Sequence, residues 1–382
     1  MRRATSLKRL PSLTNQPSNR LTLAVAGSRK TQGLVDSCKA ADPRERILVL
    51  TYTSHNQREL SSRLDRLAGD HPHIEVRGWF SFLLQNFVHP FLPLMFEGRR
   101  VEGFDFDSPP QTYAATGSWQ RYINEQADVR RVHLPELAVQ INQAGAGICL
   151  QRLERVYDRL MIDEVQDLCG YDLEILDLLM ASSVTLEMVG DIRQAILATN
   201  QREAKHKPFM YMKIWKWFQT QEQAGRLAIE QRCETWRCAP EIAAFADSLF
   251  GPEWGFEPTV SLNTVRTDHD GIFLIAPGHV DEYDALYHPI LLRNSKASGK
   301  QYDHLECLNW GKAKGLERPR VLIHPTGPIG KLITKARELN DQQAANLYVA
   351  VTRARHSVGF IIKPPKDTVI PVWTPEAGIV GS

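Results

Sequence analysis

The sequence of 382 residues predicts an α/β fold with parallel sheets. Three segments each consist of a short apolar run, a polar turn and a helix-forming stretch. They begin with LTLAVA at 21–26, RILVLTYT at 46–53 and LMI at 160–162. A fourth strand, VTLEMVGD, ends at Asp191, and further strand and helix patterns follow residue 225. Because strands that alternate with helices form parallel sheets, we expect two α/β units in one chain.

The expected domain organisation follows these patterns and the changes in composition between them. Residues 93–120 are rich in Gly, Pro and Asp, which indicates an irregular insertion before a helical sequence pattern resumes. We therefore expect a flexible basic arm at 1–20, a first domain at 21–92 and 151–225, a reduced insertion at 93–150, and a second domain at 226–382 with a further reduced insertion at about 252–300.

Composition is that of a globular protein and not of a disordered, fibrous or membrane-spanning one. The hydrophobic content of 43% and charged content of 24% are those of a globular protein, and the net charge of +2 neither requires nor excludes nucleic acid. The six cysteines have no metal-binding spacing and favour a reducing compartment. No apolar run approaches the roughly 18 residues of a membrane span. We expect a soluble cytoplasmic protein with no membrane partner.

The start of the chain is basic and rich in Ser and Thr, as organelle transit peptides are. The first core strand is expected near Leu21, however, which leaves little to be cleaved. A flexible basic arm is the simpler interpretation.

Residues 24–31 read AVAGSRKT and resemble a phosphate-binding loop, whose usual pattern is G-x-x-x-x-G-K-[ST]. Lys30 and Thr31 stand in place, and Gly27 and Ser28 lie within the loop. Ala24 and Arg29 occupy the two glycine positions, so the motif alone does not match. An arginine before the lysine is compatible with a working loop if its backbone has negative φ. Its side chain can then turn out to solvent or lie along the phosphates as an added positive charge.

Asp163 and Glu164 follow an apolar strand, and GDIRQ at 190–194 closes the next one. Nucleotide hydrolysis needs one carboxylate to hold Mg²⁺ and a neighbour to orient or deprotonate the attacking water. A solvated acidic pair is the simpler alternative. Because the carboxyl ends of parallel strands converge, we expect both carboxylates to face one bound phosphate together with Lys30, Thr31 and Gln194.

Eight sequence motifs occur along the chain in the same order as in the UvrD/Rep-type superfamily 1A DNA helicases, which the chain therefore resembles. AVAGSRKT is similar to motif I, LTYTSHNQREL to Ia, GWFSF to a variant of Ib, IDEVQD to II, GDIRQAI to III, ETWRCAPEI to IV, GKAKGLE to V and LYVAVTRAR to VI. The resemblance implies two tandem RecA-like P-loop NTPase domains, with ATP bound between them. The chain resembles a compact member with reduced accessory subdomains and a degenerate phosphate loop.

The resemblance also implies a role for each matching residue. Lys30 binds phosphates, Thr31 and Asp163 hold Mg²⁺, Glu164 is the catalytic base and Gln194 senses the γ-phosphate. Arg237 and Arg353 would come from the second domain as arginine fingers, because guanidinium groups stay charged and fork onto phosphate oxygens. The remaining nucleotide-binding candidates are Gly27, Ser28, Arg29, Tyr52, Gly315 and Glu317.

Single-stranded nucleic acid is the implied partner, and such strands are bound by aromatic stacking in basic grooves. Trp79 and Phe80 lie in the motif Ib variant. Motif III of the family continues into an aromatic pair that stacks on the strand, whereas this chain has Leu197 and Thr199. Residues 205–218 interleave lysines with aromatic residues, so Tyr211 and Trp215 are candidates for a relocated stacking surface.

The sequence thus supports an ATP-driven translocase or helicase on single-stranded DNA, with the 3′ to 5′ direction that the family implies. One alternative is a nucleotide-gated sensor or adaptor of nucleic acid that controls a protein partner, such as a nuclease or a repair or defence factor. Another is an inactive pseudo-ATPase, which rests on the altered phosphate loop alone. Turnover stimulated by single strands separates these interpretations.

Overall fold

The computed structural model describes residues 19–200 and 204–375, which form two parallel sheets of six strands each. The first sheet has the strand order β3-β2-β6-β7-β1-β8. Its strands are β1 (Arg20–Ala24), β2 (Ile47–Thr51), β3 (Ile74–Gly78), β6 (Arg159–Ile162), β7 (Thr185–Gly190) and β8 (Ala228–Arg232). The predicted α/β fold with two tandem RecA-like domains is confirmed.

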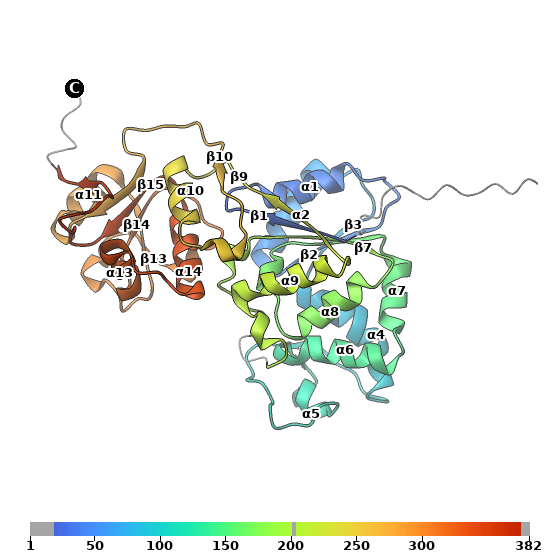
Figure 1. The fold of residues 1–382 in the computed structure, drawn as a ribbon. Coiled ribbons are helices and arrows are strands. Elements are labelled where there is room, and N and C mark those ends of the chain that lie inside the picture. The colour runs from blue at the N-terminus through green and yellow to red at the C-terminus, as the bar shows by residue number, and fades with distance from the viewer. Residues whose placement is uncertain (1–18, 201–203, 376–382) are drawn as a thin grey trace, which may run out of the picture.

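Helices cover both faces of the first sheet (Figure 1). Ile47 and Val49 of β2 point to one face, and Leu48 and Leu50 to the other, because side chains alternate along a strand. The first face packs on α1 (Lys30–Lys39) and α2 (Ser54–Leu67), and the second on α3 (Trp79–Leu83), α8 (Tyr171–Met180) and α9 (Ile214–Gln223).

The small helical insertion of the first domain shares the core of that domain. Its elements are α4 (His89–Phe91), β4 (Phe104–Asp105), α5 (Trp119–Tyr122), β5 (Val129–Arg130), α6 (Leu134–Ala144) and α7 (Ile148–Val156), and a π-helical segment at Leu84–Val88 joins α3 to α4. Buried residues of α6 and α7, such as Leu137 and Leu153, lie in one cluster with Leu160 of β6. The insertion therefore supports the sheet directly.

The second sheet has the order β13-β12-β14-β15-β11-β16. Its strands are β11 (Gly271–Ile275), β12 (Ile290–Arg293), β13 (Cys307–Asn309), β14 (Arg318–Ile323), β15 (Ala354–Ile361) and β16 (Val372–Trp373). One face packs on α10 (Pro240–Asp247), α12 (Trp310–Ala313), α13 (Gly327–Lys335) and α14 (Asp341–Val351), and the other on α11 (Val280–Tyr287).

Two segments belong to other parts of the fold than the sequence predicted. β8 pairs with β1, so the first sheet extends beyond residue 225, because this strand completes the edge beside β1. The predicted insertion at about 252–300 contains β11 and β12, which are inner strands of the second sheet. Their apolar runs are buried on both faces, as parallel strands require. Residues 1–18 of the predicted basic arm lie outside the described residues.

The connection between the two sheets runs through a pair of short strands, β9 (Glu234–Thr235) and β10 (Val260–Ser261). The three strands that carry the predicted motifs end together, since Leu23 of β1 pairs with Gly190 of β7 and Ile162 of β6 with Met188. Polar residues that follow these strands therefore share one edge of the sheet, which faces the second domain. No helix in the described part of the chain is long and apolar enough to cross a membrane.

Trp215, one of the predicted stacking residues, is buried in the core of the first domain. Its indole N–H donates to the carbonyl of Trp254 at 2.8 Å, and its ring lies 6.1 Å from that of Phe256. The structure contradicts the nucleic-acid assignment, because a ring buried in the core beside the loop after α10 has no face for a base.

Trp215→Ala should therefore lower the free energy of unfolding by about 3–5 kcal/mol, the usual cost of removing a large buried side chain. Denaturant unfolding followed by fluorescence measures this change. Lys216→Ala, at an exposed position on the same helix, is the matched control and should leave stability within about 0.5 kcal/mol of the parent. A stable Trp215→Ala protein with reduced strand affinity would contradict the core assignment.

Candidate active site

The phosphate loop joins β1 to α1 and packs against the segment that follows β8. Gly27 has φ 76°, and a Cβ there would lie 2.5 Å from Cβ of Arg237 and 2.6 Å from Oγ1 of Thr235. The hydroxyl of Thr235 donates to the carbonyl of Ala26 at 2.7 Å, and the N–H of Trp236 donates to the carbonyl of Gly27 at 3.1 Å. Glycine is therefore required at 27, and the loop is held by residues far away in the sequence.

Arg29 adopts the left-handed conformation, with φ 59° and ψ 35°. The condition of negative φ is thus not met, and this backbone costs an arginine roughly 1–2 kcal/mol relative to glycine. Its side chain is exposed, and the guanidinium carbon lies 4.8 Å from the centre of the Trp236 ring. A cation–π contact of this kind is worth about 0.5–1 kcal/mol at an exposed site and offsets part of the strain.

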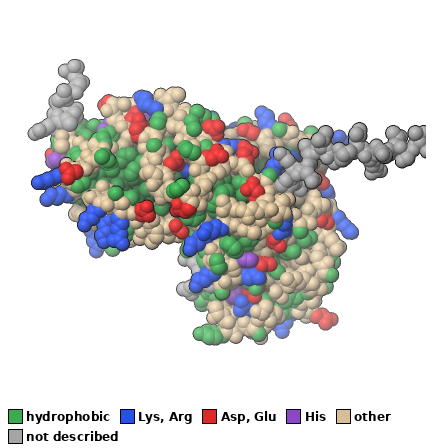
Figure 2. All heavy atoms as spheres, in the orientation of Figure 1, with side chains coloured by type: hydrophobic (Ala, Val, Ile, Leu, Met, Phe, Trp, Pro, Cys, Tyr) green, Lys and Arg blue, Asp and Glu red, His purple; other side chains and the backbone are tan. Residues whose placement is uncertain are grey.

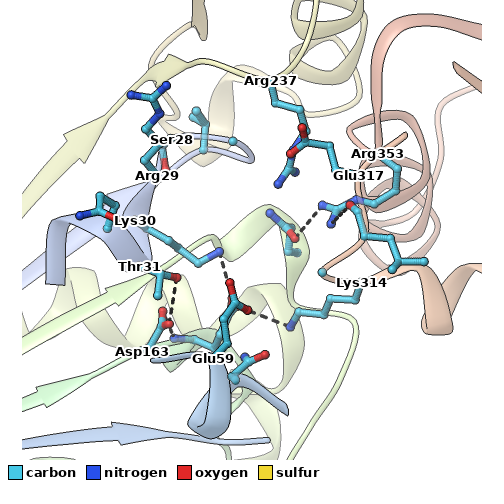
Figure 3. A pocket seen from close by; sticks show the side chains of 18 of the residues that line it. Ser28, Arg29, Lys30, Thr31, Glu59, Asp163, Arg237, Lys314, Glu317 and Arg353 are labelled. Carbon is cyan, nitrogen blue, oxygen red and sulfur yellow. Dashed lines mark hydrogen bonds and ion pairs between the residues drawn. The ribbon is translucent and has the colours of Figure 1, made fainter. Parts of the chain in front are cut away.

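α1 begins at Lys30, so its first N–H groups lack partners within the helix and favour an anion at this end. The ammonium of Lys30 lies 3.0 Å from Glu164, and the hydroxyl of Thr31 donates to Asp163 at 3.3 Å (Figure 3). The phosphate loop and the two carboxylates therefore lie together, as the sequence predicted. Thr31 and Asp163 offer two adjacent oxygen ligands, which fits Mg²⁺ because this ion keeps several waters and needs few protein ligands.

Burial and close charges shift the pKa values of these groups. Burial disfavours the charged ammonium, but the carboxylates of Glu164, Asp163 and Asp191 raise the pKa of Lys30 above its ordinary value. Burial also opposes ionisation of Glu164, yet the ammonium groups of Lys30 and Lys314 hold its pKa well below the usual range. Burial and the adjacent Glu164 charge raise the pKa of Asp163. Of the pair, Asp163 is therefore the first to take up a proton as the pH falls.

The second domain adds cations to this edge. Arg353 donates from its guanidinium to the side-chain oxygen of Gln194 at 3.1 Å, and Arg237 donates to Glu317 at 2.9 Å. Burial and the charge of Arg237 lower the pKa of Arg353 to about 10, which still leaves it protonated at neutral pH. Both arginines thus reach the cavity from the positions that the resemblance implied.

A cavity of about 1140 Å³ lies between the domains. It is lined by all the predicted catalytic, metal and nucleotide residues: Gly27, Ser28, Arg29, Lys30, Thr31, Tyr52, Asp163, Glu164, Gln194, Arg237, Gly315, Glu317 and Arg353. This volume accommodates a nucleoside triphosphate, since sites for small molecules usually measure about 300–1,000 Å³.

Sequence reasoning missed several residues that line this cavity, and two of them contact the phosphate loop or the carboxylates. Trp236 precedes Arg237 and has 38% of its surface exposed, and Lys314 precedes Gly315 and contacts two carboxylates of the first domain. Both stand next to residues that were selected, so their places in motifs IV and V were the signal that could have identified them.

The remaining nucleic-acid candidates differ in exposure. Trp79 is buried, and its indole N–H donates to Asp172 at 2.7 Å, so the structure contradicts its assignment as a strand contact. Tyr211 is half-buried. Phe80 is also half-buried, and its ring meets those of Tyr52 at 5.6 Å and Phe106 at 6.4 Å. Phe80 and Tyr211 therefore retain partly accessible rings.

Phe106 belongs to the insertion and was not selected from the sequence. Its side chain is 52% exposed, and the guanidinium of Arg131 lies 6.0 Å from its ring centre and 5.8 Å from that of Phe80. An accessible ring beside a cation is the combination that binds a base and its phosphate.

Comparison with known proteins finds similarity to helicases over part of the chain. The sequence model of the UvrD/REP helicase N-terminal domain matches residues 103–213, which include the carboxylate motif and the strand after it. This match confirms the resemblance to UvrD-like superfamily 1 helicases. No curated protein matches the chain.

Two solved structures are similar to the chain: Arterivirus nonstructural protein 10 (helicase), and the same protein in complex with DNA. The identities are 14% and 15%, and the TM-scores are 0.46 and 0.44. Each comparison covers 92% of this chain, whereas it covers 61% and 62% of the viral chains. The chain thus corresponds to less than two thirds of the length of those helicases.

Arg29→Gly should stabilise the fold by about 1 kcal/mol, because glycine adopts positive φ without strain while the contact with Trp236 is lost. Nucleotide hydrolysis should stay within about tenfold of the parent, a change of no more than about 1.4 kcal/mol in the barrier. Thermal unfolding and a phosphate-release assay measure the two effects.

Ala336→Gly is the matched control, since Ala336 also has positive φ, at 49°, and ends α13 away from the cavity. It should gain stability without changing hydrolysis. Lys30→Ala should abolish hydrolysis in either background. Hydrolysis by Lys30→Ala at the parental rate would show that the loop does not bind phosphate.

Proposed function

We propose that the protein hydrolyses ATP with Mg²⁺ between its two domains and uses this cycle to move along single-stranded DNA in the 3′ to 5′ direction. The observation that carries the proposal is the contact of Arg353 with Gln194 across the cavity. The guanidinium of the second domain thereby contacts a polar side chain at the edge of the first sheet that lines the cavity. Hydrolysis at such a site depends on closure of the domains, which is how chemistry drives motion.

The residues of the cavity divide the work of hydrolysis. The backbone around Gly27 and the ammonium of Lys30 would hold the phosphates, and Thr31 and Asp163 would hold Mg²⁺, which neutralises phosphate charge. Glu164 would accept the proton of the attacking water. Arg353 and Arg237 would stabilise the charge that develops on the transferred phosphoryl group.

The base end of the nucleotide is expected beside Trp236, whose exposed indole lines the cavity next to the phosphate loop. Aromatic rings stack on any base, so this contact adds affinity without selecting one base. Tyr52 closes another side of the cavity, and burial raises the pKa of its hydroxyl, which stays neutral. These two rings would give the nucleotide site its apolar walls.

Tyr52 also touches Phe80, so the proposed nucleotide site borders the proposed strand site. Figure 2 shows a hollow in the outline between the domains, with Lys and Arg side chains at its margin. A strand stacked on Phe80 and Phe106 would lie against Tyr52 through a single ring contact. This arrangement supports coupling of strand binding to hydrolysis.

Glu164→Gln should retain nucleotide binding and lose most hydrolysis, since the amide keeps the shape of the side chain but cannot accept the proton. The measurement is steady-state phosphate release with and without single-stranded DNA, together with a binding titration. Glu97→Gln, at an exposed position of the insertion, is the matched control and should behave like the parent.

If single-stranded DNA raises the rate of hydrolysis by the parent, the result supports the motor. Displacement of a strand from a duplex with a 3′ single-stranded tail would support the proposed direction. Binding of both ligands with negligible turnover would instead favour the nucleotide-gated sensor that controls a protein partner. Turnover by Glu164→Gln close to that of the parent would contradict the role of Glu164.

Phe106→Ala should weaken binding of single-stranded DNA by about 1–3 kcal/mol, the usual contribution of one stacked base. Fluorescence anisotropy with a labelled oligonucleotide measures the change, and stability should be nearly constant because the ring is half exposed. Tyr113→Ala is the control, since this ring lies fully exposed in the same insertion. Equal losses in both variants would contradict a specific surface at Phe106.

A further inference from the structure

The turn that follows β4 carries Phe106 and is held by one largely buried carboxylate. One oxygen of Asp105 accepts from the backbone N–H of Asp107 at 3.2 Å and from that of Ser108 at 2.9 Å. The side chain of Asp105 is 9% exposed. Burial opposes its ionisation, but hydrogen bonds, those from Ser108 above all, hold its pKa below the ordinary value. Asp105 is therefore charged at neutral pH and closes the turn that presents Phe106.

The second oxygen of Asp105 joins this turn to β5. It accepts from the guanidinium of Arg130 at 3.3 Å and from the side-chain amide of Asn124 at 3.2 Å. β4 and β5 also pair with each other, and Asp105 lies opposite Arg130 in the register. Arg131 is the next residue along the chain. The carboxylate that fixes the turn at Phe106 therefore also fixes the backbone that carries the cation of Arg131.

Arg131 forms no ion pair with a carboxylate of the described residues, whereas its neighbour Arg130 pairs with Asp105. The side chain of Arg131 is half-buried, and its Nε is buried without a hydrogen bond. Its guanidinium carbon lies about equally far from the ring centres of Phe80 and Phe106, at 5.8 and 6.0 Å. A half-buried cation without a counter-charge attracts an anion, and the anion beside a stacked base is a phosphate.

The two positions after GDIRQ at which stacking rings were expected do not offer a surface to a base. Thr199 is buried and donates its hydroxyl to Asp172, and Leu197 has no ring. Phe106, in contrast, is 52% exposed. Its ring meets that of Phe80 at an interplanar angle of 81°, so a flat base cannot enter between the two rings. A base can stack only on the exposed face of Phe106, which limits this surface to a single nucleotide.

We propose that the insertion holds one nucleotide of a single strand, with its base stacked on Phe106 and its phosphate paired with Arg131, and that Asp105 keeps the two groups together. The guanidinium suits this role, because its planar fork binds two phosphate oxygens and keeps its charge. Asp105 touches neither the base nor the phosphate, so it is a positioning residue that acts through the turn and through β5. This inference rests on the proposed function and extends its strand site from a ring to a complete nucleotide.

The test measures the binding of a fluorescein-labelled oligothymidylate to the full chain by fluorescence anisotropy at several salt concentrations. Each phosphate contact on a single strand adds about 0.7 to the steepness with which log affinity falls against log salt concentration. Arg131→Gln should therefore make this slope shallower by about 0.7 and lower the affinity at low salt by about tenfold. Phe106→Ala should lower the affinity and leave the slope unchanged, because a stacked base releases no counterions.

Asp105→Asn should lower both the affinity and the slope, because an amide has one acceptor oxygen and turns its own donors toward Arg130 and Asn124. Added to Phe106→Ala and Arg131→Gln together, it should cost no further affinity, since it acts only through those residues. If thermal unfolding shows that Asp105→Asn does not fold, Arg130→Gln is the second variant, because it removes only the contact between the turn and β5. A parental slope in the folded variant would overturn the role of Asp105.

Arg99→Gln is the matched control, because Arg99 also lies over a ring of the insertion, that of Trp119 at 4.7 Å. No ring contact joins Trp119 to Phe80 or Phe106 in the part of the chain that the structure describes, so this variant should keep the parental affinity and slope. If Arg131→Gln keeps the parental slope while Phe106→Ala loses affinity, the phosphate contact is overturned and the stacking surface stands. If the parent binds no single-stranded DNA, the proposed strand site fails and the inference fails with it.

Discussion

The need to neutralise buried carboxylates at the carboxyl edge of the first sheet determines much of the arrangement of the two domains. Asp163, Glu164, Asp167 and Asp191 are all largely buried there. Buried charges are tolerated only with partners, and removal of one partner leaves a costly uncompensated charge. The first domain supplies Lys30 and Arg193 for these four carboxylates, and the second domain adds Lys314.

Tyr348 connects the carboxyl edge of the first sheet to the phosphate loop through its neutral hydroxyl group. Its hydroxyl donates to Asp191 at 3.1 Å and accepts from the N–H of Ala26 at 3.1 Å. Burial strongly raises the pKa of this phenol, so it remains a donor at all ordinary pH values. One side chain of α14 thereby contacts the loop and the strand end of the first domain at once. Movement of α14 relative to the first sheet must change both contacts together.

The sequence was sufficient to predict the strands and the site residues that follow them, because these depend on strand periodicity and on motif order. The strands before Lys30, Asp163 and Asp191 were placed correctly because each is a short apolar run with polar residues at its end. Exposure was harder to predict, since Trp79 and Trp215 occur in aromatic stretches of sequence that suggested a binding surface yet lie in the core. Whether a large ring is buried depends on elements distant in sequence, such as α8 for Trp79, and no local pattern records that.

Two residues of the cavity show how far the local backbone depends on this distant packing. Arg29 and Glu164 both have positive φ, at 59° and 56°, a region that side chains other than glycine enter at a cost. Each is held by a group far away in sequence: Trp236 contacts Arg29, and Lys314 contacts Glu164. Both of those groups follow β8 in the chain and belong to the connection or to the second domain. Contacts from the connection and from the second domain therefore add to those that the first domain itself makes at these two strained positions.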